Sequence, residues 1–90
     1  MPFVYIARCA DDTYYTGWSN DVDRRLAQHN RGRGGRYTRT HGPVTLVYRE
    51  QVPDRGRAMR REAQIKKYSR GRKVRLIAGI PTGVSVADSA

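Results

Sequence analysis

The chain has 90 residues, 38% of them hydrophobic, which suffices for one domain with a small core and no separate recognition domain. Its formal net charge of +10 is concentrated in residues 31–75, which carry fifteen Lys or Arg and three acidic residues, and this favours a polyanionic partner such as nucleic acid. The single cysteine, Cys9, excludes an internal disulfide and a zinc site of Cys/His type, and the lack of a signal pattern or of a run of roughly 18 apolar residues predicts a cytoplasmic protein.

Two β-prone segments open the chain and predict an antiparallel hairpin. Phe3–Cys9 is mostly apolar, and Thr13–Trp18 follows it after a short polar connection. Tyr5 and Tyr15 then lie on adjacent strands, within reach across one face if the register of the pairing permits. Gly17 has no side chain, so another backbone or a ligand is expected to approach closely at the end of the second strand.

A helix is predicted next, with Ser19 or Asn20 as its N-cap and its end at about Asn30, before a Gly-rich stretch. Its inner face follows the i, i+4, i+7 spacing and comprises Val22, Leu26 and His29. Because successive helical residues are about 100° apart, Arg25 lies beside His29 at the edge of that face. The two side chains can therefore point together at a group next to the sheet.

A basic, Gly-rich segment follows this helix and predicts a flexible loop rather than a helix or strand. One interpretation is a surface connection whose charge keeps the protein soluble. The other, which we favour, is a loop that follows the phosphates of a nucleic acid, with an aromatic ring available to stack on a base. The candidate nucleic-acid-binding residues in this loop are Arg31, Arg33, Arg36, Tyr37 and Arg39.

A third strand is predicted over Val44–Val52, and Asp54 can cap a helix over Arg55–Tyr68. The apolar arc of this helix comprises Ala58, Met59, Ala63 and Ile65. Glu62 falls near the middle of that arc, although carboxylates are rarely buried unless they are paired or bind a metal. The alternative is an i, i+4 ion pair of Glu62 with Lys66 at the surface, and considered alone this alternative is the better explanation.

The end of the chain predicts a short helix and a mobile tail. Ser69–Gly71 is expected to break the preceding helix, Arg72–Ala78 to form the last one, and residues 80–90 to be mobile. The resulting order β-β-α-β-α-α predicts an α+β domain over residues 1–79, in which helices flank a three-stranded antiparallel sheet.

Two triplets at this spacing resemble the GIY-YIG endonuclease superfamily, whose pattern is Gly-Ile-Tyr followed some ten residues later by Tyr-Ile-Gly. Here Phe3-Val4-Tyr5 corresponds to the first triplet and Tyr15-Thr16-Gly17 to the second. Arg25 corresponds to the arginine of the first helix, and His29 to a histidine one turn later in many members. Glu62 corresponds to the metal-binding glutamate of a later helix. Five positions in order, in matching helical and strand contexts, make the resemblance specific.

The resemblance covers roughly residues 3–78, and it includes departures from the family pattern. Phe3 replaces the first Gly and Thr16 replaces the second Ile, but neither position carries a side chain that does chemistry in the family. Some members also use an Asn beyond the Glu, and this chain has none after Asn30. The basic loop and the pair Lys66 and Lys67, which we add to the candidate nucleic-acid-binding residues, are similar to the small single-domain bacterial members.

The resemblance implies a set of roles for hydrolysis of a phosphodiester. Glu62 and several waters would hold one Mg²⁺ or Mn²⁺, for which a single carboxylate is ordinary. Tyr5 would be the general base or orient the attacking water. Because a free tyrosine has a pKa near 10, Arg25, the metal or proton transfer to a neighbour must assist it, and His29 is the best such neighbour. Arg25 would bind the scissile phosphate. Tyr15 would hydrogen-bond the phosphate or the water.

We therefore predict a metal-dependent endonuclease that cleaves DNA, single-stranded or branched and with low sequence specificity, because a shallow basic face with loop aromatics suits exposed bases. The alternative is a non-catalytic nucleic-acid-binding module, for DNA or RNA, on the same fold. A third and weaker interpretation is an RNA-directed or ribosome-associated role. No membrane and no obligate protein partner is implied.

Overall fold

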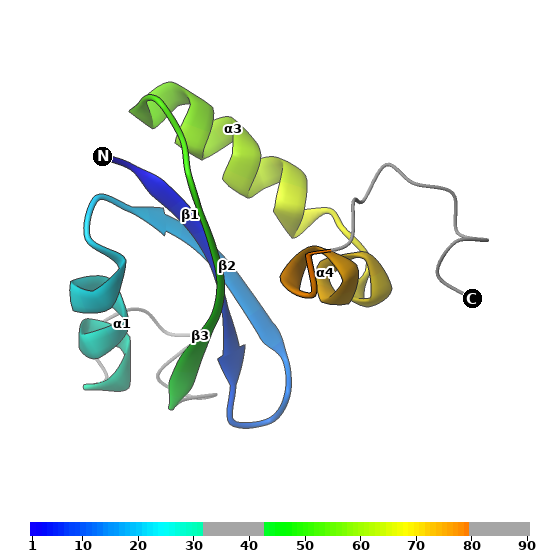
Figure 1. Ribbon diagram of the computed structural model, residues 1–90. Coiled ribbons are helices and arrows are strands. Elements are labelled where there is room, and N and C mark those ends of the chain that lie inside the picture. The colour runs from blue at the N-terminus through cyan, green and yellow to red at the C-terminus, as the bar shows by residue number, and fades with distance from the viewer. Residues whose placement is uncertain (32–42, 80–90) are drawn as a thin grey trace.

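Three antiparallel strands form the sheet, with the first strand of the chain in its centre (Figure 1). The computed structural model describes residues 1–31 and 43–79. The elements are β1 (Phe3–Cys9), β2 (Tyr14–Ser19), α1 (Val22–Asn30), β3 (Val44–Gln51), α3 (Arg55–Lys66) and α4 (Arg70–Ile77). The strand order is β2-β1-β3, so the predicted α+β fold with a three-stranded antiparallel sheet flanked by helices is confirmed.

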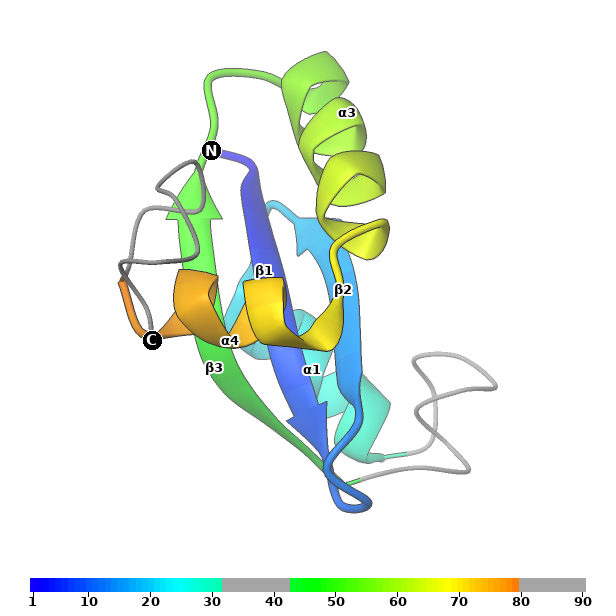
Figure 2. The same ribbon diagram turned by 90° about the vertical axis from the view of Figure 1, so that its right-hand side faces the viewer.

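Helices cover both faces of the sheet: Figure 2 shows α3 and α4 on one face and α1 on the other. The central strand β1 is therefore buried on both sides, which explains its nearly continuous apolar sequence. Its alternate residues Tyr5, Ala7 and Cys9 pack in the cluster on the α1 face, so Cys9 is a core residue. Val4 and Ile6 pack with α3 and α4.

A β-bulge in β3 keeps the side chains of that strand on the appropriate faces. The pairing with β1 shifts from Ile6 opposite Tyr48 to Ala7 opposite Leu46, so Val47 is the extra residue. As a result Val47 and Tyr48 both pack on the α3 and α4 face, whereas Leu46 packs on the α1 face.

The N-cap of α1 is Asp21 and not Ser19 or Asn20, so that prediction is wrong. The Asp21 side chain accepts a hydrogen bond from the backbone N–H of Arg24 at 3.1 Å. Ser19 instead bonds with both the backbone N–H and the carbonyl of Asp21, at 3.0 Å each. These bonds hold Asp21 in the extended conformation that an N-cap requires.

The end of α1 is tied to the start of β3. The Asn30 side chain donates to the carbonyl of Val44 at 3.1 Å and accepts from its backbone N–H at 2.7 Å. This pair of bonds connects the two ends of the segment 32–42, which lies outside the described residues together with residues 80–90. The predictions of a flexible basic loop and of a mobile tail fall on those segments and stay predictions.

The stripe by which α3 packs on the sheet is narrower than predicted. Asp54 caps the helix as expected, and only Ala58 and Ile65 are fully buried among its residues. Met59 is 50% exposed and Ala63 is also exposed, so their assignment to the buried arc is wrong. These two residues, seven positions apart, bring the helix into contact with the sheet, whereas Met59 and Ala63 lie further around the helix and face outward.

The last helix begins at Arg70 and not at Arg72 as predicted, because Ser69 is its N-cap. The preceding helix ends at Lys66, before Ser69. The Ser69 hydroxyl accepts from the backbone N–H of Arg72 at 3.2 Å, and Gly71 lies inside α4. Arg70 in the first turn donates to the carbonyl of Asp12 at 2.7 Å and lies 4.9 Å from the ring centre of Tyr14. These contacts fix the start of α4 beside the turn between β1 and β2.

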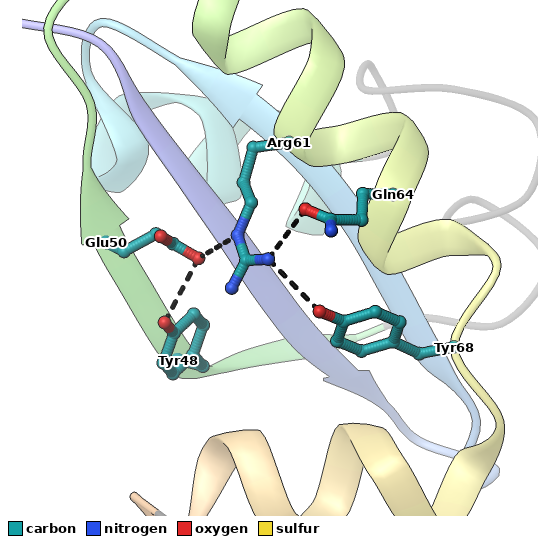
Figure 3. A network of polar contacts seen from close by, with 5 residues as sticks. All are labelled: Tyr48, Glu50, Arg61, Gln64 and Tyr68. Carbon is teal, nitrogen blue, oxygen red and sulfur yellow. Dashed lines mark hydrogen bonds and ion pairs between the residues drawn. The ribbon is translucent and has the colours of Figure 1, made fainter. Parts of the chain in front are cut away.

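A polar network fixes the rotation of α3 about its own axis (Figure 3). Arg61 donates to a carboxylate oxygen of Glu50 on β3 at 2.8 Å, and the same oxygen accepts from the Tyr48 hydroxyl at 3.1 Å. Arg61 also donates to Gln64 and Tyr68, at 2.8 and 3.1 Å. Because α3 packs through Ala58 and Ile65, Arg61 lies on the flank of the helix that faces β3. Glu62, the next residue, lies on the other flank, which faces β2.

Across residues 1–31 and 43–79 there is no helix with the length and apolar character needed to cross a membrane.

Candidate functional site

The ring of Tyr5 lies directly over Gly17. The two residues are opposite each other in the β1–β2 pairing. A Cβ atom at Gly17 would lie 2.7 Å from the Tyr5 hydroxyl oxygen and 2.9 Å from Cζ. The close approach expected at this glycine is made, within the protein, by the side chain of Tyr5 and not by another backbone segment. This contact gives a physical reason for a tyrosine in the first triplet and a glycine in the second.

Gly17→Ala should destabilise the protein by about 1–3 kcal/mol, because the added methyl group overpacks the site under Tyr5. Gly71→Ala is the matched control, since a Cβ there meets nothing within 4 Å. That control should stabilise α4 by about 0.5–1 kcal/mol, because glycine is a poor helix former. Urea unfolding of both variants measures the two effects. Equal free energies of unfolding for the two variants would show that the Tyr5 ring moves aside without loss of stability.

Tyr5 and His29 form a buried polar pair on the α1 face. The Tyr5 hydroxyl lies 3.2 Å from His29 Nε2, and the two residues are only 1% and 2% exposed. Burial, and then the charge of Arg25, lower the pKa of His29, so the ring is neutral at pH 7 and Nε2 can accept a hydrogen bond. Burial first, and then Tyr15, raise the pKa of Tyr5 to about 12. The phenol therefore keeps its proton at neutral pH and can donate it to His29.

Stability should fall as the pH falls below 6.5, because the folded state resists protonation of His29. Its pKa in the folded state lies below the ordinary value of 6.5, so the unfolded chain binds more protons in this window. The free energy of unfolding then rises with pH, by at most about 1.4 kcal/mol per pH unit for one such group. Urea unfolding between pH 5 and 7.5 tests this slope. In His29→Gln the free energy of unfolding should depend less steeply on pH. An unchanged pH dependence would show that other titratable groups cause it.

Tyr15 completes a cluster of three rings. Its ring centre lies 6.4 Å from that of Tyr5 and 5.1 Å from that of His29, and it meets the imidazole edge to face. Distances and angles of this kind are favourable for aromatic pairs. The prediction that Tyr5 and Tyr15 lie within reach across one face is therefore confirmed, and His29 joins them from α1.

Arg25 lies between this cluster and an open hollow. The residue is partly buried, and its guanidinium donates to the Gln28 side chain at 3.5 Å. Its positive charge and hydrogen bonding oppose the rise in the pKa of Tyr5. Arg25 also lines a hollow of about 480 Å³ between the end of β2 and α1. A phosphate in that hollow can reach the guanidinium without entering the core.

Glu62 approaches from the other face of the sheet, on the flank of α3 that faces β2. Its Oε1 atom lies 3.4 Å from the Lys66 ammonium group, so the i, i+4 ion pair that we considered as the alternative is present. The two partners differ in exposure, however: the Lys66 side chain is 54% exposed, whereas the Glu62 side chain is only 23% exposed and therefore partly buried. The charge of Glu62 also contributes to raising the pKa of Tyr5, which places it within electrostatic range of the ring cluster.

Glu62 suits a hard divalent cation better than zinc. Within residues 1–31 and 43–79 no three His, Cys, Asp or Glu side chains are grouped as a metal site. Mg²⁺ nevertheless binds through one or two carboxylates while it keeps several waters and contacts substrate phosphates. A partly buried single carboxylate with an open side matches this requirement, so the residues present fit Mg²⁺ or Mn²⁺.

The remaining candidates divide between the surface and the part of the chain that is not described. Arg31, Lys66 and Lys67 are exposed, as a binding role requires. The loop residues Arg33, Arg36, Tyr37 and Arg39 lie outside the described residues. Sequence reasoning assigned no role to Lys73 or Thr16, which the structure places beside Lys66. No sequence signal connects them, since a helix boundary separates Lys66 from Lys73 and Thr16 lies on a distant strand.

The family model of the GIY-YIG catalytic domain matches residues 1–75, a range that includes every described candidate residue. The chain therefore belongs to the GIY-YIG family, and with it to a superfamily of nucleases. The resemblance inferred from the two triplets is confirmed.

Similar proteins carry names that give no activity. A UPF0213 protein from Staphylococcus aureus strain Mu50 is 48% identical over 75 residues, which are 83% of this chain and 92% of that protein. A solution NMR structure of a UPF0213 protein from Bacillus halodurans has 43% identity and a TM-score of 0.55, and covers 87% of this chain and 84% of its own. An NMR structure of a protein from E. faecalis has 33% identity and a TM-score of 0.58, with coverages of 86% and 82%.

Proposed function

We propose that the protein is a divalent-metal-dependent endonuclease that hydrolyses phosphodiester bonds in DNA. The observation that carries this proposal is the buried hydrogen bond between Tyr5 and His29, beside Arg25. Burial of a phenol with a proton acceptor at 3.2 Å provides a path for the proton that hydrolysis must remove from water. GIY-YIG nucleases in general depend on a divalent metal, which agrees with the fit of Glu62.

Tyr5 and His29 act as a relay in this mechanism. Because the pKa of Tyr5 is about 12, little phenolate is present at neutral pH. The phenol oxygen instead accepts a proton from the attacking water while its own proton passes to Nε2 of His29. The water becomes the nucleophile, the phenol is regenerated, and the imidazole carries the proton. Tyr15, in contact with both rings, orients the phosphate or the water.

Arg25 and Glu62 supply the charges that the phosphate requires. Arg25 binds the scissile phosphate with two parallel donors, because its planar guanidinium matches two phosphate oxygens. A divalent cation at Glu62 would neutralise charge on the phosphate and on the leaving 3′ oxygen. Lys66 holds the Glu62 carboxylate in position through its ion pair.

The substrate that we propose is single-stranded or branched DNA, cut with low sequence specificity. The net charge of +10 supplies attraction to phosphates that does not depend on sequence.

A specific contact favours a second function, a nucleic-acid-binding module without catalysis. The ammonium group of Lys66 already neutralises Glu62 at 3.4 Å, and a carboxylate paired in this way competes less well for a cation. Such a module would bind DNA or RNA and cleave neither.

Cleavage of end-labelled single-stranded and duplex DNA, with Mg²⁺, Mn²⁺ or EDTA, distinguishes the two functions. The nuclease should cut only with metal and should prefer the single strand. Binding that weakens with salt, without cleavage under any of these conditions, would establish the second function, and RNA would be tested next. Preferred cutting of the duplex at one site would overturn the proposed substrate class.

A further inference from the structure

A second hollow, of about 260 Å³, lies between β2 and the junction of α3 with α4. Figure 2 shows the connection from α3 to α4 running along β2. The hollow is lined by Tyr14, Tyr15, Thr16, Lys66 and Lys73. Tyr15 also contacts the rings of Tyr5 and His29 on the other face of the sheet. The hollow is therefore separated from the candidate catalytic site only by the edge strand β2.

Two ammonium groups line this hollow, and they belong to Lys66 and Lys73. Lys66 pairs with Glu62 at 3.4 Å, whereas Lys73 has no ion-pair partner in the described part of the chain. Burial, and next the positive charge of Lys66, lower the pKa of Lys73. The two like charges repel each other, so an anion bound in the hollow would offset this repulsion.

Thr16, which lines the same hollow, carries a buried hydroxyl group. The residue is 3% exposed, and its Oγ1 atom is buried without a hydrogen-bond partner among the described residues. Buried hydroxyl groups are nearly always bonded in folded proteins, and an exception calls for an explanation. A phosphate oxygen is a strong acceptor for such a hydroxyl.

We propose that this hollow binds a phosphate group of the nucleic-acid strand, next to the phosphate held at Arg25. Lys66 and Lys73 neutralise its charge, and the Thr16 hydroxyl donates to one of its oxygens. The strand then passes over the edge of β2, from the α1 face to the α3 and α4 face, and the scissile bond lies between the two held phosphates. This assignment rests on the proposed function and adds to it the path of the substrate.

The test measures binding of a fluorescent thymidine oligonucleotide in EDTA over a range of salt concentrations, so that no cleavage is involved. Lys73→Gln should reduce the slope of log K against log salt by about 0.7, as expected for the loss of one contact to a single strand. Arg57→Gln is the matched control, because it removes the same charge from the first turn of α3, where Arg57 pairs with exposed Asp54. Its slope should remain close to that of the parent protein.

Thr16→Val provides a second variant with opposite effects on folding and binding. It removes an unbonded hydroxyl from the core, so the melting temperature should rise, while the affinity for the oligonucleotide should fall by roughly fivefold or more. A higher melting temperature with unchanged affinity would exclude Thr16 from the site.

The outcomes separate this inference from the proposed function. Equal slopes for Lys73→Gln and Arg57→Gln, with a parent protein that binds and cleaves DNA, would overturn the phosphate site alone. A parent protein that binds no nucleic acid would overturn both. With the site as proposed, Lys73→Gln should raise KM for cleavage and leave kcat nearly unchanged.

Discussion

Glu62→Gln should reduce DNA cleavage by about a thousandfold or more while leaving DNA binding intact. The amide keeps the size and shape of the side chain but lacks the charge that would hold a divalent cation, and loss of the metal removes several kcal/mol of transition-state stabilisation. The substitution also frees the Lys66 ammonium group from its partner at 3.4 Å. Affinity for DNA in EDTA should therefore be equal to or slightly higher than that of the parent.

The matched control for this variant is Asp23→Asn, which removes one negative charge from the exposed first turn of α1. It changes net charge equally but lies away from α3, so cleavage should stay within about twofold of the parent value. Cleavage by Glu62→Gln at the parent rate would remove Glu62 from the proposed site. If Tyr5→Phe, described next, also cleaved at the parent rate, the cleavage would be assigned to a contaminating nuclease.

Tyr5→Phe should reduce cleavage by about 10²–10⁴-fold, because it removes the hydroxyl group that accepts the proton of water and passes its own to His29. The loss of the buried hydrogen bond should lower the free energy of unfolding by only about 0.5–1.5 kcal/mol. The fold should therefore persist, and affinity for DNA should change little. Single-turnover cleavage at saturating protein measures the chemical step separately from binding.

Tyr48→Phe is the matched control for the tyrosine variant. It also removes a hydroxyl group with a hydrogen bond, the one to Glu50 at 3.1 Å, but on the opposite face of the sheet (Figure 3). A similar loss of stability with full cleavage is expected. If both variants cleave at the parent rate, Tyr5 has a packing role over Gly17 and the relay is wrong.

The local part of the candidate site could be predicted from sequence periodicity. Alternation along two neighbouring strands predicts that Tyr5 and Tyr15 share a face, and the pairing confirms it. The four-residue spacing within α1 likewise predicts that Arg25 and His29 lie side by side. These conclusions hold because each depends on geometry within one element or between strands joined by a short turn.

Predictions that depended on distant contacts were less successful. The apolar arc predicted for α3 includes Met59, but packing through Ala58 and Ile65 leaves the Met59 side chain exposed. The choice between a surface pair and a functional role for Glu62 also could not be made locally. The bond of Arg61 to Glu50 decides which flank of α3 faces β2, and that bond joins residues eleven positions apart.

The sequence by itself determined the family and the order of the elements, because two triplets at a set spacing identify the family and local periodicity identifies each element. The register of the hairpin, which places Gly17 opposite Tyr5, was decided by the pairing of the strands. Only the tertiary structure decided which groups gather around β2. Lys73 and Thr16 are brought to one hollow by the way α3 and α4 pack across the sheet. That packing depends on long-range contacts, such as Arg70 with Asp12, which no local periodicity encodes.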